Sequence, residues 1–162
     1  MLNNHSFIRR SAFLFFITGL LLFLSSFSML RVNPQHSREG LTDDILKYTN
    51  QFRHAEGLPA LVMRNDLNAI ARRHSVDMAS GRCDFGHKGY DDRESEVEKL
   101  IRPCHGMAEN VAYGPETGKE VVAMWENSKG HRKNMLGDYK WIGIGTATDR
   151  RGVIYYTQIF VR

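Results

Sequence analysis

The chain has 162 residues, of which 42% are hydrophobic and 25% charged, and its formal net charge is +4. This length accommodates one domain plus a targeting segment. The composition is that of an ordinary globular protein, which excludes a fibre, a disordered chain and a protein with several membrane spans. Arg9 and Arg10 account for half of the positive excess. Because no basic run interleaved with aromatic residues follows, a nucleic-acid partner is not expected.

The N-terminal segment 1–28 is predicted to direct export. A basic pair precedes the uncharged, Phe- and Leu-rich stretch 11–30, and Ser26 and Ser28 supply the small residues of a cleavage site, so a signal peptide cut after Ser28 is expected. An uncleaved anchor is the alternative, because about 20 apolar residues span the hydrocarbon core. Either form predicts a protein that is secreted, periplasmic or anchored to the outer face of the cytoplasmic membrane, with membrane contact only through this segment.

The body of the chain is predicted to be one α+β domain. Residues 29–40 predict a linker, and the domain is expected at 41–162. Its first helix is predicted from an N-cap at Thr42 to Gly57. Further helices are expected over 65–80, 91–101 and from 117 or 118, and His74 and Trp125 on their apolar stripes are expected in the core. Residues 141–148 and 153–161, rich in β-branched and aromatic residues, predict a terminal antiparallel hairpin.

Cys83 and Cys104 are the two cysteines of the chain. An oxidising compartment favours their pairing, so a disulfide is expected. Two isolated thiols are the alternative, because the sequence does not reveal whether the Cα atoms lie within bridging range.

Three local motifs carry most of the chemical information. They are Phe85-Gly-His87, the segment 108–112 with Glu109 and Asn110, and the run from Trp125 to Leu136. In this order, with the closing segment 156–160, they resemble the CAP superfamily of cysteine-rich secretory proteins, venom allergens and plant pathogenesis-related proteins, in its bacterial form. The resemblance covers roughly residues 41–162. It implies an α-β-α sandwich in which three to four helices surround a mainly antiparallel sheet.

The resemblance also implies a polar cleft with two histidines and two acids, sometimes occupied by zinc or another divalent cation. His87 matches the first histidine and Glu109 the first acid. The second acid is replaced by Ser128 and the second histidine by Tyr155, while His131 lies where it can enter the same cleft. The implied cleft residues are therefore His87, Glu109, Asn110, Ser128, His131 and Tyr155, with His87 and His131 as candidate metal ligands.

Three functional hypotheses follow, and the sequence favours the first. The domain is expected to be a non-catalytic binding module for an envelope or extracellular ligand, which is a lipid, a glycan or a protein. The second hypothesis is a hydrolase of peptide, ester or glycan bonds that uses Glu109 or His131 as general base, with or without a metal-bound water. In the third, His87, Glu109 and His131 form a purely structural network. All three require that the three motifs converge in space.

Overall fold

The computed structural model describes residues 34–162. The predictions of a signal peptide, an anchor and a cleavage site within 1–28 therefore lie outside the described residues. Among the residues that are described, no helix is both long and apolar enough to cross a membrane.

Five helices and four strands make up this part of the chain. In order they are α1 (Pro34–Ala55), β1 (Val62–Met63), α2 (Asn65–Ala79), α3 (Tyr90–Leu100), β2 (Met107–Tyr113), α4 (Gly118–Glu126), α5 (Lys129–Met135), β3 (Trp141–Thr148) and β4 (Ile154–Val161). The strand order is β1-β3-β4-β2, with β1 parallel to β3 and the other two pairings antiparallel. The predicted α+β class and the terminal hairpin are confirmed.

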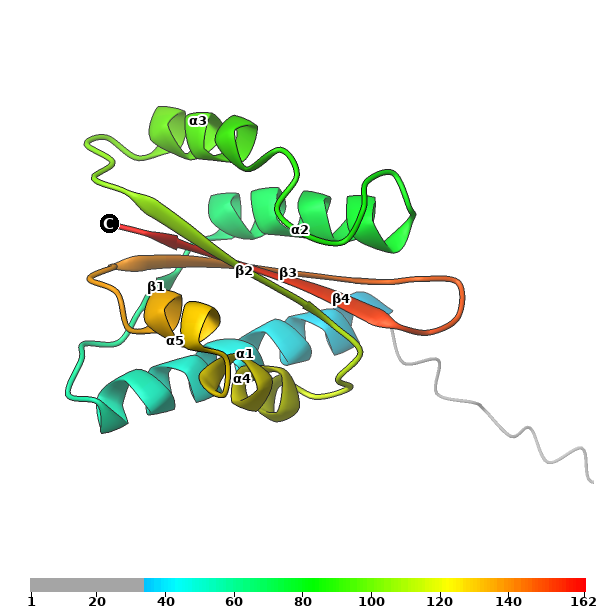
Figure 1. The fold of residues 1–162 in the computed structure, drawn as a ribbon, viewed down its shortest axis with the longest axis horizontal. Helices are drawn as coiled ribbons and strands as arrows, with labels where there is room; N and C mark the ends of the chain where they lie inside the picture. Colours follow the sequence, from blue (N-terminus) through cyan, green and yellow to red (C-terminus); the bar gives the residue numbers. More distant parts are fainter. Residues whose placement is uncertain (1–33) are drawn as a thin grey trace, which may run out of the picture. The chain divides into compact units, whose positions relative to one another are not determined.

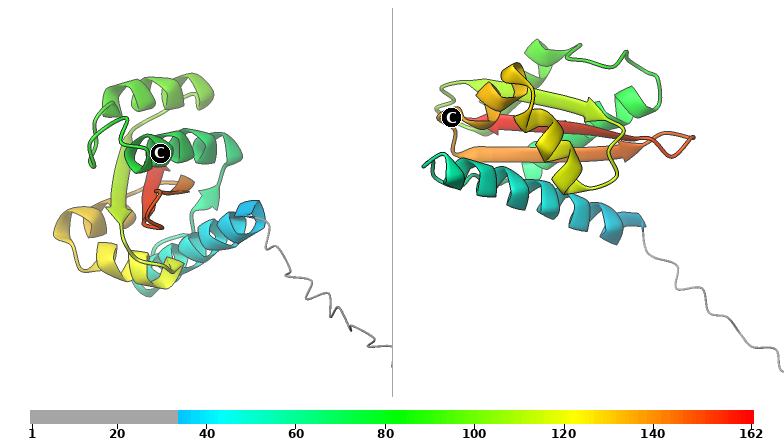
Figure 2. Two further views of the ribbon diagram at one scale, coloured as in Figure 1. Left: turned by 90° about the vertical axis from the view of Figure 1, so that its right-hand side faces the viewer. Right: turned by 60° about the horizontal axis from the view of Figure 1, so that its bottom comes forward.

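Helices cover both faces of the sheet (Figures 1 and 2). On one face, Ile159 and Val161 of β4 pack with α2 and α3 residues such as Leu67. On the other face, Tyr156 and Phe160 pack with residues of α1 and α4. Because alternate residues of a strand point to opposite faces, β4 contributes to both cores.

Two helical boundaries differ from the sequence predictions. α1 begins at Pro34, so residues 34–40 of the predicted linker are helical, and Thr42 lies inside the helix rather than at its N-cap. The segment after Gly118 contains two helices instead of one, which brings the described residues to five helices rather than three or four. The break falls at Asn127 and Ser128, the C-cap of α4 and the N-cap of α5.

α2 lies directly on the backbone of β3. A Cβ atom placed on Gly143 would lie 2.5 Å from the backbone carbon of Leu67, and one on Gly145 would collide with the backbone of Arg72. Glycine at both positions therefore permits the close approach. The hydroxyl of Ser75 donates to the Gly145 carbonyl at 3.0 Å and lies 2.8 Å from the Thr157 hydroxyl, which fixes α2 along the sheet.

β2 is a strand that the sequence does not predict. The local pattern indicates only a motif before a turn, yet this segment pairs with β4 over its whole length. Its residues are buried up to Tyr113 because helices cover both faces. The strand places Glu109 and Asn110 on opposite faces of the sheet.

The predicted disulfide between Cys83 and Cys104 is wrong, since both thiols are free. The backbone N–H of Cys83 bonds the carbonyl of Asp77 near the end of α2. Cys104 instead packs against the cluster that contains Leu67, near the start of α2. A disulfide would require their Cα atoms within about 7 Å, and the two thiols are not paired.

Candidate functional site

The Glu109 carboxylate is the centre of a buried ion-pair network. Arg93 of α3 donates from Nε to Oε2 and from Nη2 to Oε1, both at 2.7 Å. The Nδ1 atom of His87 lies 2.8 Å from Oε1. The Glu109 side chain is 0% exposed and that of Arg93 9%, whereas that of His87 is 50% exposed. The ionised carboxylate accepts a hydrogen bond from Nδ1–H, so in a neutral His87 ring the Nε2 lone pair is available to a ligand as an acceptor.

His74 supports this network from α2. Its Nε2 atom bonds the Gly86 carbonyl at 2.8 Å and lies 3.9 Å from Oε1 of Glu109. Burial lowers the pKa of His74, and the nearby charge of Arg93 lowers it further. The neutral ring therefore donates to the loop that carries His87, which confirms the predicted structural role of this histidine.

An open cleft of about 390 Å³ lies in front of the network. Lys133 lines it and takes part in no ion pair within residues 34–162. Tyr90 donates to the Met107 carbonyl at 2.7 Å, and burial, followed by the charges of Glu94 and Glu109, raises the pKa of Tyr90 to about 12. Because Arg93 neutralises Glu109, the cleft presents the imidazole of His87, the amide of Asn134 and the unpaired ammonium of Lys133. The cleft is lined by His87, Tyr90, Met107, Ala108, Glu109, Lys133, Asn134 and Tyr139.

α5 brings His131 to the same region. Burial lowers the pKa of His131, and the neighbouring His87 lowers it further. The Nδ1 atom of His131 is buried without a hydrogen-bond partner. Asn134 holds α5 on β2 by donating to the Glu109 carbonyl at 3.0 Å and to the Asn110 amide oxygen at 2.9 Å. The structure thus brings together the three motifs whose convergence the sequence predicts.

Three other predicted cleft residues lie elsewhere or contribute differently. Asn110 is fully buried and donates to the His131 carbonyl at 3.3 Å and to Gln158 at 3.2 Å, so it joins α5 to the sheet. Ser128 is the N-cap of α5, and its side chain makes no capping hydrogen bond. Tyr155 stacks on Tyr113, with ring centroids 5.6 Å apart, and lines a different cavity.

Five residues of this site were not predicted from the sequence, namely Arg93, Tyr90, Lys133, Asn134 and Tyr139. A signal for Arg93 was present, because it precedes Val97 by four residues and so shares the inner face of α3. An arginine on a buried helix face requires hydrogen-bond acceptors, and a carboxylate is the acceptor that also balances its charge. Glu109 is the buried acid that supplies it.

The family model described as CAP, the cysteine-rich secretory protein family, matches residues 46–160. The chain belongs to the CAP family. The uncharacterized protein YkwD of Bacillus subtilis (strain 168) is 34% identical over 110 residues, which are 62% of this chain and 40% of that protein. This chain therefore spans less than half the length of that curated relative.

Solved structures agree with the CAP assignment. An extracellular protein containing an SCP domain from Bacillus anthracis superposes with a TM-score of 0.69 at 27% identity, covering 81% of this chain and 44% of that one. An outer surface protein from Borrelia burgdorferi has a TM-score of 0.64 at 18% identity, covering 76% of this chain and 93% of that one, which supports the fold alone. The resemblance to the bacterial form of the family is confirmed.

The divalent cation implied by the CAP resemblance fits this cleft poorly. Both oxygens of Glu109 accept hydrogen bonds from Arg93, so the carboxylate is not a free ligand. His87 and His131 then remain as two imidazoles beside a guanidinium, fewer than the three protein ligands of a typical catalytic zinc site. Within the described part of the chain, no group of three or more His, Cys, Asp or Glu side chains is arranged to hold a metal.

Proposed function

We propose that this CAP protein is exported and that its domain binds an envelope or extracellular ligand through the His87 cleft without catalysing its turnover. The ligand class comprises lipids, glycans and proteins with hydrogen-bond acceptors or negative charge. Export is supported by the N-terminal sequence pattern and by the Bacillus anthracis relative described as an extracellular protein.

One observation carries the proposal: the bidentate ion pair between Arg93 and Glu109. A general base must be free to accept a proton, and a metal ligand must offer a lone pair. Glu109 is fully buried behind His87 and meets neither requirement. The cleft surface instead offers the ammonium of Lys133, which suits an acceptor or an anion, and Nε2 of His87, which in the neutral ring accepts a hydrogen bond from a ligand donor.

Co-sedimentation with isolated bacterial sacculi, and separately with lipid vesicles of envelope composition, tests this function. We expect His87→Ala and Lys133→Gln to reduce the bound fraction of the purified protein. His54→Ala removes an exposed histidine from α1 and should bind like the wild type. Equal binding of the His87 and His54 variants would move the functional surface away from this cleft.

A hydrolase is the second candidate, favoured by the hydrogen bond between His87 and Glu109. In this arrangement the acid orients the histidine, whose Nε2 atom is the base, so Glu109 is a positioning residue. Among the described residues, no serine or cysteine side chain is hydrogen-bonded to His87. Turnover of peptide, ester or glycan substrates that His87→Ala abolishes and a chelator leaves unchanged would favour this function over simple binding.

A further inference from the structure

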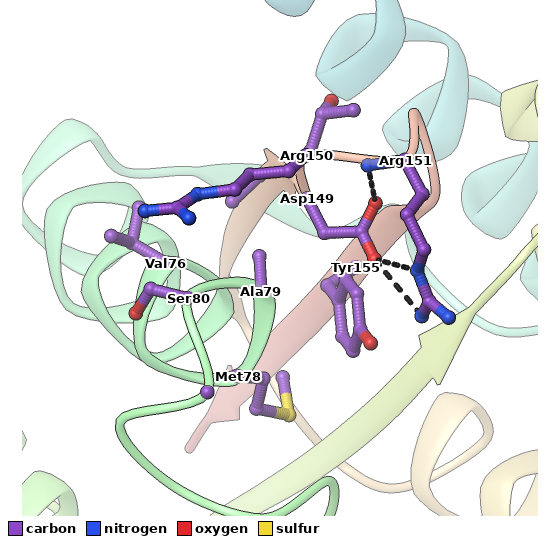
Figure 3. Close-up of a pocket in the computed structure, with 11 residues that line it drawn as sticks. Val76, Met78, Ala79, Ser80, Asp149, Arg150, Arg151 and Tyr155 are labelled. Carbon is purple, nitrogen blue, oxygen red and sulfur yellow. Dashed lines mark hydrogen bonds and ion pairs between the residues drawn. The ribbon is translucent and has the colours of Figure 1, made fainter.

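A larger cavity, of about 760 Å³, lies between the C-terminal end of α2 and the β3–β4 hairpin. It shares no lining residue with the His87 cleft. Its volume falls within the range of about 300–1,000 Å³ that small-molecule sites occupy. Figure 3 shows Asp149, Arg150 and Arg151 on the hairpin side and Val76 and Ser80 on the α2 side, and Tyr155 and Met78 also line the cavity.

A row of three aromatic rings leads from this cavity across the sheet. Tyr155 of β4 pairs with Tyr113 of β2, and their rings stack at an interplanar angle of 24°. Tyr113 contacts Phe85 edge to face, with ring centroids 4.8 Å apart. Tyr113 is 52% exposed and Phe85 48%. Contiguous exposed aromatic surface of this kind marks ligand-binding regions of soluble proteins.

The hairpin that closes the cavity is held in shape by Asp149. Its Oδ1 atom accepts from the backbone N–H groups of Arg151 at 2.8 Å and Val153 at 2.9 Å. Arg151 also pairs with this carboxylate through its side chain at 3.2 Å. The cavity wall beside Arg150 is therefore fixed before any ligand arrives, which lowers the entropic cost of binding.

Arg150 supplies the charge of the site. It takes part in no ion pair within the described residues, and it extends over the cavity toward Val76 and Ser80 (Figure 3). A guanidinium binds carboxylate or phosphate groups through two parallel hydrogen bonds. A negatively charged ligand group would therefore complement this cavity.

We propose that the hairpin cavity and the aromatic row form a binding site for an anionic oligosaccharide. Sugar rings present flat C–H faces, which pack on exposed aromatic surface, and Phe85 and Tyr113 are each about half exposed. The sugar hydroxyl groups match the polar walls at Ser80 and Thr148. The walls combine apolar side chains such as Val76, Met78 and Ala147 with charged and hydroxyl-bearing ones, which suits an amphipathic sugar ring better than a purely apolar lipid tail. The cavity shares no lining residue with the His87 cleft, so this proposal does not rest on the function proposed for that cleft.

Fluorescence anisotropy tests the proposal with labelled hyaluronan and galacturonate hexasaccharides, which carry carboxylates, and with chitohexaose, which is neutral. We expect an acidic hexasaccharide to bind at least about tenfold more tightly than chitohexaose, a difference of about 1.4 kcal/mol. Tyr113→Ala and Arg150→Gln should each weaken binding of the acidic hexasaccharide by about tenfold. Both side chains are exposed, so melting temperatures should stay near that of the wild type.

Two matched variants isolate the site. Arg102→Gln makes the same charge change as Arg150→Gln at an exposed position beyond α3 and should bind like the wild type. His87→Ala should also keep its affinity, which separates this site from the proposed function of the cleft. If neither acidic hexasaccharide binds, the proposal is overturned. Equal binding of polyglutamate, a polyanion without sugar rings, would overturn it as well, because charge alone would then explain the affinity.

Discussion

Arg93 Nε and Nη2 contact different oxygens of Glu109, each at 2.7 Å, in a site from which water is nearly excluded. A charge buried in this way is stable only while its partner is present. The pair also fixes the carboxylate that orients His87. The ion pair between Arg93 and Glu109 therefore supports the cleft structurally. Removing it should lower the stability of the fold more than it lowers ligand binding by the folded protein.

Arg93→Ala should lower the free energy of unfolding by about 3–5 kcal/mol, because it leaves the Glu109 carboxylate buried and unpaired. Glu109→Leu in the same background should recover part of this loss. Urea denaturation of the single and double variants measures the coupling. Arg73→Ala breaks the exposed pair with Glu96 and should cost less than about 1 kcal/mol. Similar losses for Arg73→Ala and Arg93→Ala would contradict the buried ion-pair assignment.

Acidification should destabilise the fold through His74 and His131. Burial lowers the pKa of both below the ordinary value of 6.5. The unfolded chain then binds more protons than the folded one as the pH falls through 6.5, so stability is lost toward low pH. Each histidine contributes at most about 1.4 kcal/mol per pH unit.

Chemical denaturation between pH 7.5 and 5.5 measures this dependence. His74→Gln keeps a donor for the Gly86 carbonyl and should flatten the pH profile. His54→Gln, which changes an exposed residue, should leave the profile unchanged. A profile that is as steep in His74→Gln as in the wild type would show that this ring does not titrate as its burial requires.

Zinc should bind weakly, because Arg93 occupies both oxygens of Glu109. If the dissociation constant for zinc is above about 100 µM, adding zinc at about 100 µM should raise the free energy of unfolding by less than about 0.4 kcal/mol. Thermal unfolding with and without zinc measures this stabilisation, and elemental analysis measures retained metal. One zinc ion per chain that is lost in His87→Ala would restore the metal hypothesis.

The two cysteines should react as free thiols in the folded protein. Intact-mass analysis after alkylation under native, non-reducing conditions should show two modified cysteines. Burial raises the pKa of the Cys83 thiol, and Asp77 raises it further, so this thiol should react slowly. A reductant should leave the melting temperature unchanged, whereas loss of a disulfide would cost about 3 kcal/mol.

Gly145→Ala should destabilise the domain by about 2–3 kcal/mol or more, because its Cβ atom would collide with the backbone of Arg72. The matched change Gly130→Ala lies in α5, where no atom lies within 4 Å of the added Cβ. It should be neutral or stabilising by about 0.5 kcal/mol. Differential scanning calorimetry of both variants compares the two sites, and equal melting temperatures would contradict the close packing of α2 on β3.

Local pattern alone predicted α2, α3, α4 and the β3–β4 hairpin to within a few residues, since their apolar spacing matches their secondary structure. It failed for β2, where Glu109 and Asn110 interrupt any alternation of apolar and polar residues. Helices on both faces bury this strand. Tertiary contacts therefore override a weak local preference.

The sequence by itself determined the family, the fold class and the convergence of His87, Glu109 and His131. The fold class follows from local periodicity, whereas the family and the expected convergence follow from the resemblance of the three motifs to the CAP superfamily. Only the tertiary structure decided that Arg93 neutralises Glu109, that Cys83 and Cys104 are free thiols, and that Tyr155 faces the hairpin cavity. Each of these outcomes depends on distances between segments remote in sequence, because electrostatic and covalent pairing requires contact within a few ångströms.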